Sequence, residues 1–230
     1  VRGVDRSSCD GEMKLNLDAL AMAVQGTDIV LISVPVSAME HLVGQLASLL
    51  QQDQLLMDIT SVKTLPMRWM EDTYKGPVIG THPLFGPCPT PEQLRVILVR
   101  GSAAEEKHCR AAESLYTSMG CTVEWATADE HDCGVALSQS LNFAVSASFF
   151  CLLASSPDML RFLTPSFTRH LEAARKHLTE DTDMFCEFTA YNPCFPEAVE
   201  RFAEVIGSAA SGDLPKIASE AASWYKHCKV

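Results

Sequence analysis

The chain has 230 residues, of which 47% are hydrophobic and 20% are charged, and these proportions are typical of a folded globular protein. The formal net charge of −11 at pH 7 argues against nucleic acid as a partner, because phosphate binding requires clustered Lys and Arg and no basic stripe occurs. We therefore expect a cytoplasmic protein of one large domain or two modest ones.

The nine cysteines are scattered singly along the chain. They form no C-x-x-C pair and no His/Cys cluster with metal-ligand spacing, so no metal site is expected. We find no secretory signal before them. The interpretation is a set of reduced, mostly buried thiols in a cytosolic protein.

Short apolar runs alternate with helical patterns in the first half of the chain. The segment 16–26 predicts a helix, with Asn16 as N-cap and Gly26 as the stop signal. "TDIVLISVP" (27–35) follows as a β-branched run without polar alternation, which is typical of a parallel strand covered on both faces. The remaining predicted elements of this half are helices at 39–50 and 103–120 and strands at 54–60, 77–81, 95–100 and 121–126.

From residue 129 onward the strand signal disappears, and the pattern predicts helices at 129–154, 157–178, 182–190, 196–210 and 213–227. The predicted fold is a Rossmann-like, doubly wound, mostly parallel sheet (residues 1–126) followed by an all-α domain (residues 127–230). Residues 134–154 carry no charge and are long enough to span a bilayer. Because polar residues interrupt this segment and no basic flank borders it, we predict a helix buried in a core or a subunit interface, and no membrane span.

The segment "GTHPLFGPCPTP" (80–91) places four prolines around one histidine, His82. Proline fixes its own φ and restricts the preceding residue, so neither a helix nor a central strand is expected here. The pattern predicts a stiff loop that holds one imidazole in place.

At the N-terminus, "VRGVDRSS" reads as the end of a strand followed by Asp5. In a dinucleotide-binding fold an acidic residue at the end of the second strand binds the ribose hydroxyls, and a glycine-rich turn lies about 20 residues upstream. No G-x-G-x-x-G occurs in these residues. Either Asp5 is an ordinary turn residue, or the first strand and the phosphate loop of a Rossmann domain are absent from the sequence given. In the second case the neighbouring Arg6 leaves NAD or NADP open, and the acid favours NAD.

Four stretches in chain order, "VLISVPV" (30–36), "DITSVK" (58–63), "GTHPLFGP" (80–87) and "DEHDCGVALSQSL" (129–141), resemble the prephenate/arogenate dehydrogenases of tyrosine biosynthesis. The resemblance covers most of the chain. It implies an NAD(P)-dependent oxidative decarboxylation of a cyclohexadienol that carries a ring carboxylate and a 4-hydroxyl. It also implies a homodimer formed through the helical domain.

In this family the histidine of the "HP-x-FGP" loop hydrogen-bonds the substrate hydroxyl, and a serine in "SVK" supports that histidine. Imidazole is a suitable base because its unperturbed pKa of about 6.5 allows it to accept a proton near neutrality. Ser61 could alternatively cap the next helix, and we assign His131 and Asp132 to the start of the first long helix as caps. The candidate residues are catalytic His82 and Ser61, cofactor-binding Asp5, Arg6, Val34, Pro35 and Val36, and substrate-binding Thr81, Arg175 and Lys176.

Two positions differ from the family pattern. Asn142 and Phe143 stand where many members carry a second histidine, and Lys176, beside Arg175, stands where members use an arginine for the substrate carboxylate. Lysine can neutralise a carboxylate but cannot form the planar bidentate pair. Two alternatives therefore stay open: a β-hydroxyacid-type dehydrogenase with Lys176 or Lys216 as a catalytic lysine, and a catalytically silent binding protein.

Overall fold

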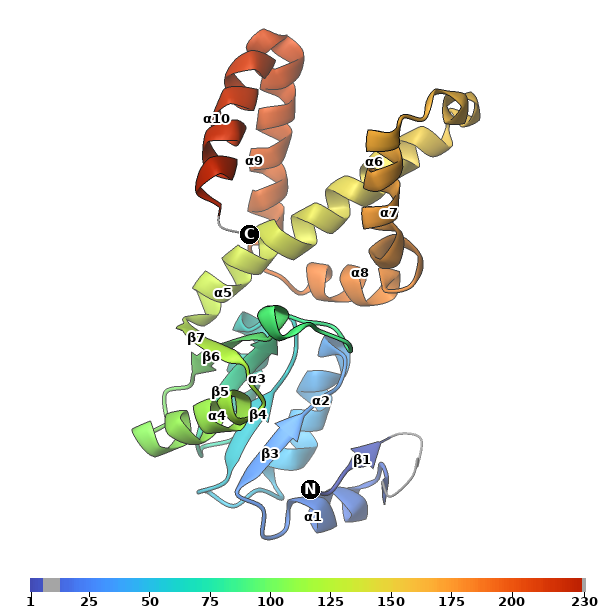
Figure 1. Ribbon diagram of the computed structural model, residues 1–230. Coiled ribbons are helices and arrows are strands. Elements are labelled where there is room, and N and C mark those ends of the chain that lie inside the picture. The colour runs from blue at the N-terminus through green and yellow to red at the C-terminus, as the bar shows by residue number, and fades with distance from the viewer. Residues whose placement is uncertain (6–12, 229–230) are drawn as a thin grey trace.

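The computed structural model describes residues 1–5 and 13–228, and Arg6 lies outside them. A sheet-containing half is followed by a helical half, as predicted (Figure 1). The sheet has the order β3-β4-β5-β6-β7, and only β5 and β6 pair antiparallel. Its strands are β3 (Ile29–Ile32), β4 (Leu55–Asp58), β5 (Val78–Pro83), β6 (Arg95–Arg100) and β7 (Thr122–Ala126).

Two short parallel strands, β1 (Val4–Asp5) and β2 (Met13–Lys14), form a separate small sheet. Asp5 ends β1, as expected from the sequence, whereas β2 was not predicted. Within the described residues no strand pairs with the outer edge of β3, where Leu31 is 45% exposed. In the Rossmann strand order 3-2-1-4-5-6 this position belongs to the first strand, the one that the sequence pattern lacks.

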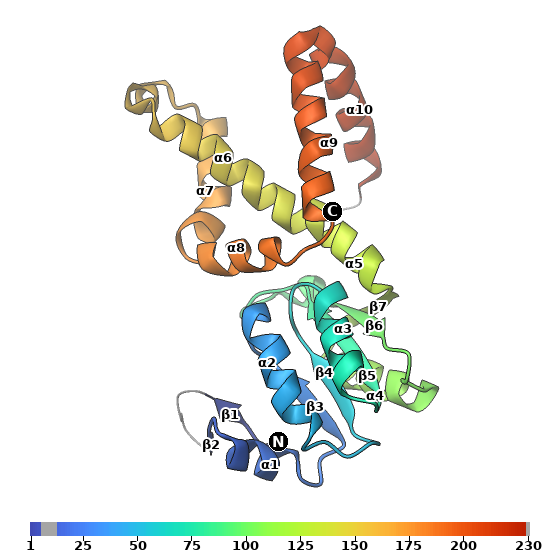
Figure 2. The same ribbon diagram turned by 180° about the vertical axis from the view of Figure 1, so that it is seen from behind.

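Helices cover both faces of the sheet, which confirms the doubly wound architecture (Figures 1 and 2). Successive residues of β4 point to opposite faces. Leu56 packs in one apolar cluster with residues of α2 and α3, and Met57 packs in the other with residues of α4. The helices of this half are α1 (Leu17–Val24), α2 (Val36–Ala47), α3 (Thr64–Thr73) and α4 (Glu106–Ser118), with a short 3-10 turn, η1 (Pro91–Gln93).

The helical half begins with one continuous helix of 27 residues, Ala128–Ala154. It contains α5 (Ala128–Val135), a π-helical turn η2 (Ala136–Leu141) and α6 (Asn142–Ala154). The predicted helix at 157–178 is in fact two elements, because Thr164 caps a new helix whose first residue is Pro165. The further elements are η3 (Pro157–Phe162), α7 (Pro165–Thr179), α8 (Thr182–Ala190), α9 (Phe195–Ser208), η4 (Ala209–Asp213) and α10 (Leu214–His227).

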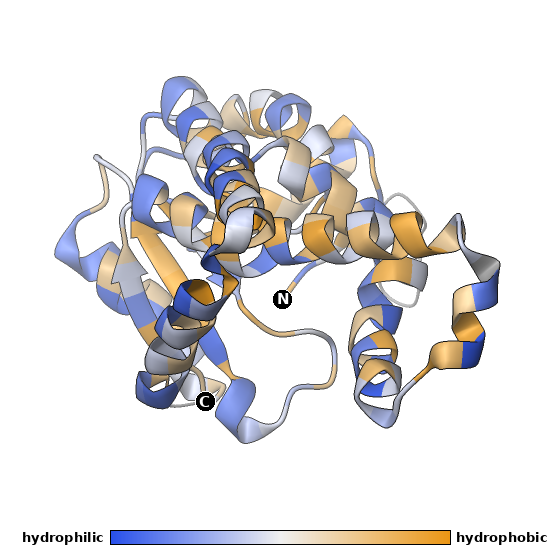
Figure 3. Cartoon of the chain, turned by 90° about the horizontal axis from the view of Figure 1, so that it is seen from above, coloured by the Kyte–Doolittle hydropathy of each residue, from blue (hydrophilic) through white to orange (hydrophobic). Residues whose placement is uncertain are grey.

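The long helix is not buried in a core, which corrects that part of the sequence-based expectation. Only 28% of its most apolar window is buried, and Leu137 and Leu152 are 50% and 67% exposed. Figure 3 shows apolar residues along the helix to its outer end. By length and composition alone this helix is long and apolar enough to cross a membrane. Its apolar surface is therefore left largely uncovered by the described residues.

An apolar cluster and a hydrogen bond join the two halves. Val36 and Val62 of the sheet half pack with Val135 and Phe188 of the helical half in a buried apolar cluster. The backbone N–H of Ser37, in the first turn of α2, donates to the Glu187 carboxylate of α8 over 2.9 Å. These contacts fix how the long helix meets the sheet.

The prediction that the cysteines are reduced and mostly buried is wrong for several of them. Cys133 of α5 and Cys194, before α9, form a disulfide that closes a segment of 61 residues. Among the free cysteines of the described chain, Cys88, Cys151 and Cys186 are exposed. The pair could not be recognised from the sequence, because its spacing matches no local motif.

The proline-rich loop is also partly a central strand, contrary to the prediction. β5 runs from Val78 through His82 to Pro83 and lies between β4 and β6. Pairing with β4 ends at Gly80, so the last three residues of β5 pair only with β6. The missing N–H of Pro83 is tolerated because this end of β5 is locally an edge.

Candidate active site

His82 lies near the carboxyl end of β5, at the edge of the sheet where open α/β folds bind ligands. The residue is 5% exposed. Burial lowers the pKa of His82 well below its usual value, and the neighbouring His131 and the Lys63 ammonium act in the same direction. His82 is therefore a neutral imidazole at physiological pH, which is the form that accepts a proton.

The ring of His82 contacts a second histidine from the helical half. Nδ1 of His82 lies 2.8 Å from Nε2 of His131, and the two rings meet edge to face with centroids 5.0 Å apart. His131 does not cap the long helix, which corrects the sequence-based assignment. The cap is Thr127, whose hydroxyl and backbone N–H pair with Glu130 in a capping box.

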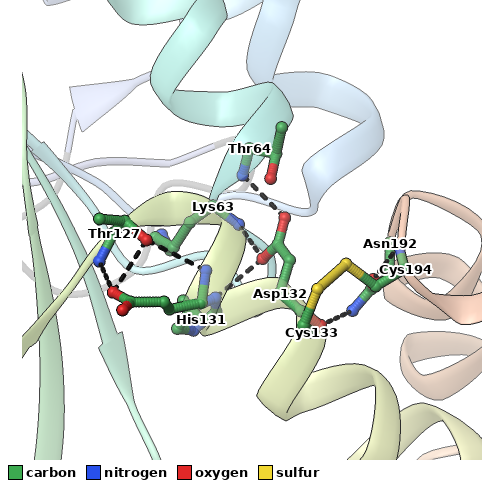
Figure 4. The surroundings of a disulfide bond; sticks show 9 residues. Lys63, Thr64, Thr127, His131, Asp132, Cys133, Asn192 and Cys194 are labelled. Carbon is green, nitrogen blue, oxygen red and sulfur yellow. Dashed lines mark hydrogen bonds and ion pairs between the residues drawn. A yellow bond between two sulfur atoms is a disulfide. The ribbon is translucent and has the colours of Figure 1, made fainter. Parts of the chain in front are cut away.

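Asp132 is completely buried beside His131 and connects the two halves. Its Oδ1 accepts from the His131 ring at Nδ1 over 2.8 Å and from the backbone N–H of Lys63 over 2.7 Å. Its Oδ2 accepts from the backbone N–H of Thr64 over 2.8 Å. Asp132 thus caps the N-terminus of α3, as Figure 4 shows.

Burial by itself would raise the pKa of Asp132. The hydrogen bonds from His131, Thr64 and Lys63 outweigh that effect and lower it, so Asp132 is ionised at neutral pH. Figure 4 also shows the Cys133–Cys194 disulfide directly after Asp132. The side-chain amide of Asn192 donates to the Asp132 backbone carbonyl over 2.9 Å. Asp132 is therefore held on both its side chain and its backbone.

Lys63 is a fully buried ammonium behind this pair. Its Nζ donates to Asp58 Oδ2 at the end of β4 and contacts the Thr60 hydroxyl. Burial lowers the pKa of Lys63, while the carboxylates of Asp58 and Asp132 act in the opposite direction. A buried ion pair thus lies next to the two histidines.

Two of the predicted site residues are placed differently from expectation. Ser61 is half-buried in the loop between β4 and α3, and within the described residues the hydrogen-bond partner of His82 is His131 rather than Ser61. Ser61 does not cap α3 either, since the Asp132 carboxylate does. Thr81 faces away from His82, is completely buried, and its hydroxyl donates to the Asp58 carbonyl and pairs with Tyr116. The Thr81 hydroxyl is therefore a core group and not a substrate ligand.

The predicted cofactor residues at the end of β3 divide into two groups. Pro35 is exposed at the start of α2 and Val34 is partly exposed beside it, so both remain available to a ligand. Val36 is 4% exposed and packs against Phe188, so its side chain belongs to the contact between the halves. Asp5 is exposed at the end of β1, as the cofactor hypothesis requires.

The loop after His82 and helix α7 enclose an open pocket of about 430 Å³. Lys176 lies on its wall opposite Gly86, where a methyl group on that glycine would be 3.8 Å from Nζ. The ammonium also pairs with Asp181 over 3.4 Å. Arg175 is exposed and does not line this pocket, so Lys176 is the cation that faces the proline-rich loop.

Phe143, one of the two residues in the region where many family members carry a second histidine, is buried in the helical half. It stacks on Phe185 with ring centroids 5.2 Å apart and meets His177 edge to face at 6.1 Å. Lys216, the other lysine considered, is exposed on α10. The described structure therefore brings together His82, His131, Asp132 and Lys63, of which only His82 was predicted as catalytic.

A doubly wound nucleotide-binding sheet, a helical half and a buried neutral histidine at the sheet edge define a dehydrogenase-type architecture. Residues 2–115 match the family model described as prephenate dehydrogenase, nucleotide-binding domain. This part of the chain belongs to the prephenate dehydrogenase family, as its motifs indicated.

Relatives and solved structures agree. The chain is 25% identical over 219 residues to a probable arogenate/prephenate dehydrogenase of Methanocaldococcus jannaschii, covering 88% of this chain and 49% of that protein. The structure of A. aeolicus prephenate dehydrogenase in complex with hydroxyphenyl propionate and NAD+ superposes with a TM-score of 0.72 at 18% identity, covering 94% of this chain and 78% of the other. Synechocystis arogenate dehydrogenase gives a TM-score of 0.73 at 16% identity, covering 90% and 78%. The chain spans about half the length of the curated relatives it matches, and the structural likeness establishes the fold.

Proposed function

We propose that the protein is a prephenate or arogenate dehydrogenase, which oxidatively decarboxylates its cyclohexadienol substrate to 4-hydroxyphenylpyruvate or tyrosine. The observation that carries the proposal is His82, a neutral and nearly buried imidazole at the carboxyl edge of the sheet. Its Nδ1 is engaged by His131, and within the described residues its Nε2 makes no hydrogen bond. Nε2 is thus the atom that can accept a hydrogen bond, and then the proton, from a substrate hydroxyl.

In the proposed reaction His82 Nε2 accepts the proton of the substrate 4-hydroxyl while hydride leaves the ring carbon that bears this hydroxyl. NAD, when bound, is the hydride acceptor. The ring carboxylate then departs as CO2, its bonding electrons make the ring aromatic, and His82 returns the proton to the phenolic oxygen. No net proton is released, so the imidazole acts as a base and then as an acid.

The described residues match part of a dinucleotide site. Pro35 and Ser61 follow adjacent parallel strands, β3 and β4, and Asp5 ends β1, as expected for the nicotinamide and ribose ends. The glycine-rich turn for the pyrophosphate is not among the 230 residues. The N-terminus of α2 is not a substitute, because the Glu187 carboxylate already accepts from Ser37 there. NAD is the proposed cofactor because the acid at the end of β1 suits an unphosphorylated ribose, while NADP stays an alternative.

Lys176 is the proposed partner of a substrate carboxylate. It faces the pocket lined by residues 84–89, the segment that directly follows His82. A lysine contributes one point charge rather than a bidentate fork, so carboxylate binding would depend less on orientation than with arginine. Arg175 would need to turn toward the pocket to take this role.

The test is NAD(P)H formation by the full-length protein with prephenate and with arogenate. We expect His82→Asn to lower kcat/KM at least about 100-fold, because a positioned general base contributes about that much or more. His41→Gln, an exposed histidine on α2, is the matched control and should leave turnover unchanged. Undiminished turnover by His82→Asn would contradict the assigned base. A wild-type protein that neither turns over nor binds the cofactor would favour the silent binding protein.

The remaining partners belong to the same proposal: a homodimer through the helical half, in the cytoplasm, without membrane or nucleic acid. The negative net charge supports the last point. The dimer is supported by large apolar side chains that the helical half leaves exposed, such as Leu152, Leu214 and Trp224. A second copy of the chain would cover them and the outer surface of the long helix.

A further inference from the structure

Three side chains in contact, His82, His131 and Asp132, form a linear hydrogen-bonded chain that crosses from the sheet half to the helical half. All three are at most 5% exposed. Groups so deeply buried form their hydrogen bonds with each other rather than with water. The donor or acceptor role of one group therefore fixes the role of the next.

The direction of the chain follows from its last member. An ionised carboxylate only accepts hydrogen bonds, so the His131 ring must carry a proton on Nδ1 where it meets Asp132. A neutral His131 then has an unprotonated Nε2, which accepts from His82. His82 in turn carries its proton on Nδ1, and its Nε2 lone pair is left bare.

From this arrangement we infer that His131 and Asp132 are positioning residues that hold His82 in its Nδ1–H tautomer, with Nε2 presented as the base. The inference rests on the proposed role of His82 and extends it. A free imidazole samples both tautomers, and only one of them has the lone pair on Nε2. The wrong tautomer at a catalytic histidine costs rate even when the geometry is intact.

The direction of this chain depends on the protonation state of His131. Lys63 Nζ already carries one positive charge in the same buried region, balanced by Asp58. A second buried cation on His131 would reverse the chain, because its Nε2–H would then donate to His82 and place the His82 proton on Nε2. The two states therefore predict opposite protonation patterns at one ring.

The direct test is 15N NMR of the resting full-length protein labelled at its histidines, with His82→Asn identifying the His82 signals. The expected wild-type spectrum shows His82 protonated on Nδ1 and bare on Nε2. Protonation on Nε2 in the wild type overturns the inference, whatever the variants do. This readout needs no turnover, so it remains decisive even if the proposed reaction proves wrong.

Two variants extend the test to function. His131→Phe supplies an aromatic ring without nitrogens, and we expect the Nδ1–H preference of His82 to disappear and kcat to fall about 10- to 100-fold, with both KM values within about twofold. His131→Gln retains an acceptor near the Nε2 position and should recover most of the tautomer preference and of kcat. If His131→Phe leaves the His82 tautomer and kcat unchanged while His82→Asn is inactive, the positioning role is wrong and the proposed base stands. His41→Gln again serves as control.

Discussion

The sheet half of the chain buries Met39, Leu56 and Met57 completely, whereas α10 of the helical half buries none of its residues and α9 buries only Ala198. Both halves are rich in apolar side chains, but the sheet half encloses more of its own. Helices stacked on both faces of a sheet surround the strands with their own side chains, while a hairpin of two helices has one face that nothing in the same chain covers. The α9–α10 hairpin projects away from the sheet, as Figures 1 and 2 show.

The contrast suggests that the sheet half is stabilised by its own core, whereas the helical half offers surface for the proposed association. About 25 cal/mol per Å² of buried apolar surface supports the sheet half from within. In the helical half the corresponding surface is exposed in the described residues, and the proposed dimer would bury it. The predictions that follow test this division, beginning with the largest expected effect.

The strongest expected loss comes from the buried ion pair of the sheet half. Lys63→Met should lower the free energy of unfolding by about 3–5 kcal/mol, because it leaves the Asp58 carboxylate buried without its cation. Urea denaturation measures the change. Lys75→Met, at an exposed lysine just after α3, is the control and should stay within about 0.5 kcal/mol of wild type. Equal effects from the two variants would show that Asp58 is compensated in another way.

A smaller loss is expected at the contact between the halves. Asp132→Asn should lower the free energy of unfolding by about 1–2 kcal/mol at pH 7, since it weakens the cap of α3. The folded pKa of Asp132 is depressed below its usual value of 3.8, so its contribution is present above that value and is lost as the pH falls through the folded pKa. Denaturation between pH 2 and 7 should therefore show a weaker acid dependence in the variant. The exposed Asp129→Asn should retain the wild-type dependence.

The smallest effect on folding is expected on the exposed hairpin. Trp224 is 68% exposed, and Trp224→Ala should change the free energy of unfolding of the single chain by less than about 0.5 kcal/mol while weakening the proposed dimer. Light scattering across a dilution series measures the oligomer. Trp125→Ala, on β7 of the sheet half, is the control and should leave the dimer intact. A dimer unaffected by Trp224→Ala would place the interface elsewhere on the helical half.

Much of the fold could be predicted because its signals are local. The β-branched run around β3 and the Asn16 cap of α1 were visible as patterns, and the structure confirms both, with the Asn16 side chain accepting from Ala19 over 2.8 Å. The start of α7 could have been found, because Thr164-Pro165 is a start signal inside the predicted helix. Pro83 in β5 could not, since its tolerance depends on where the neighbouring strand ends.

The sequence predicted the candidate site only at His82, whose own neighbours in the chain mark it. His82 stands out because prolines surround it, but its partner is 49 residues away on another element. Asp132 caps a helix that begins 68 residues earlier, so the local rule for caps assigned it to the wrong helix. Thr81 was misassigned because adjacent strand residues face opposite sides of the sheet. The one available signal was "EHD" (130–132), in which the structure buries His131 almost and Asp132 completely.

The carboxylate of Asp132 holds the first backbone N–H groups of α3 and the His131 ring at the same time. Any hinge motion that separated the two halves would break these contacts together. Closure of the molecule and readiness of the base would then be a single event. An open form would lack these hydrogen bonds and would be inactive under the proposed mechanism. The substrate would meet an oriented His82 only in the closed form, in which Asp132 contacts both α3 and His131.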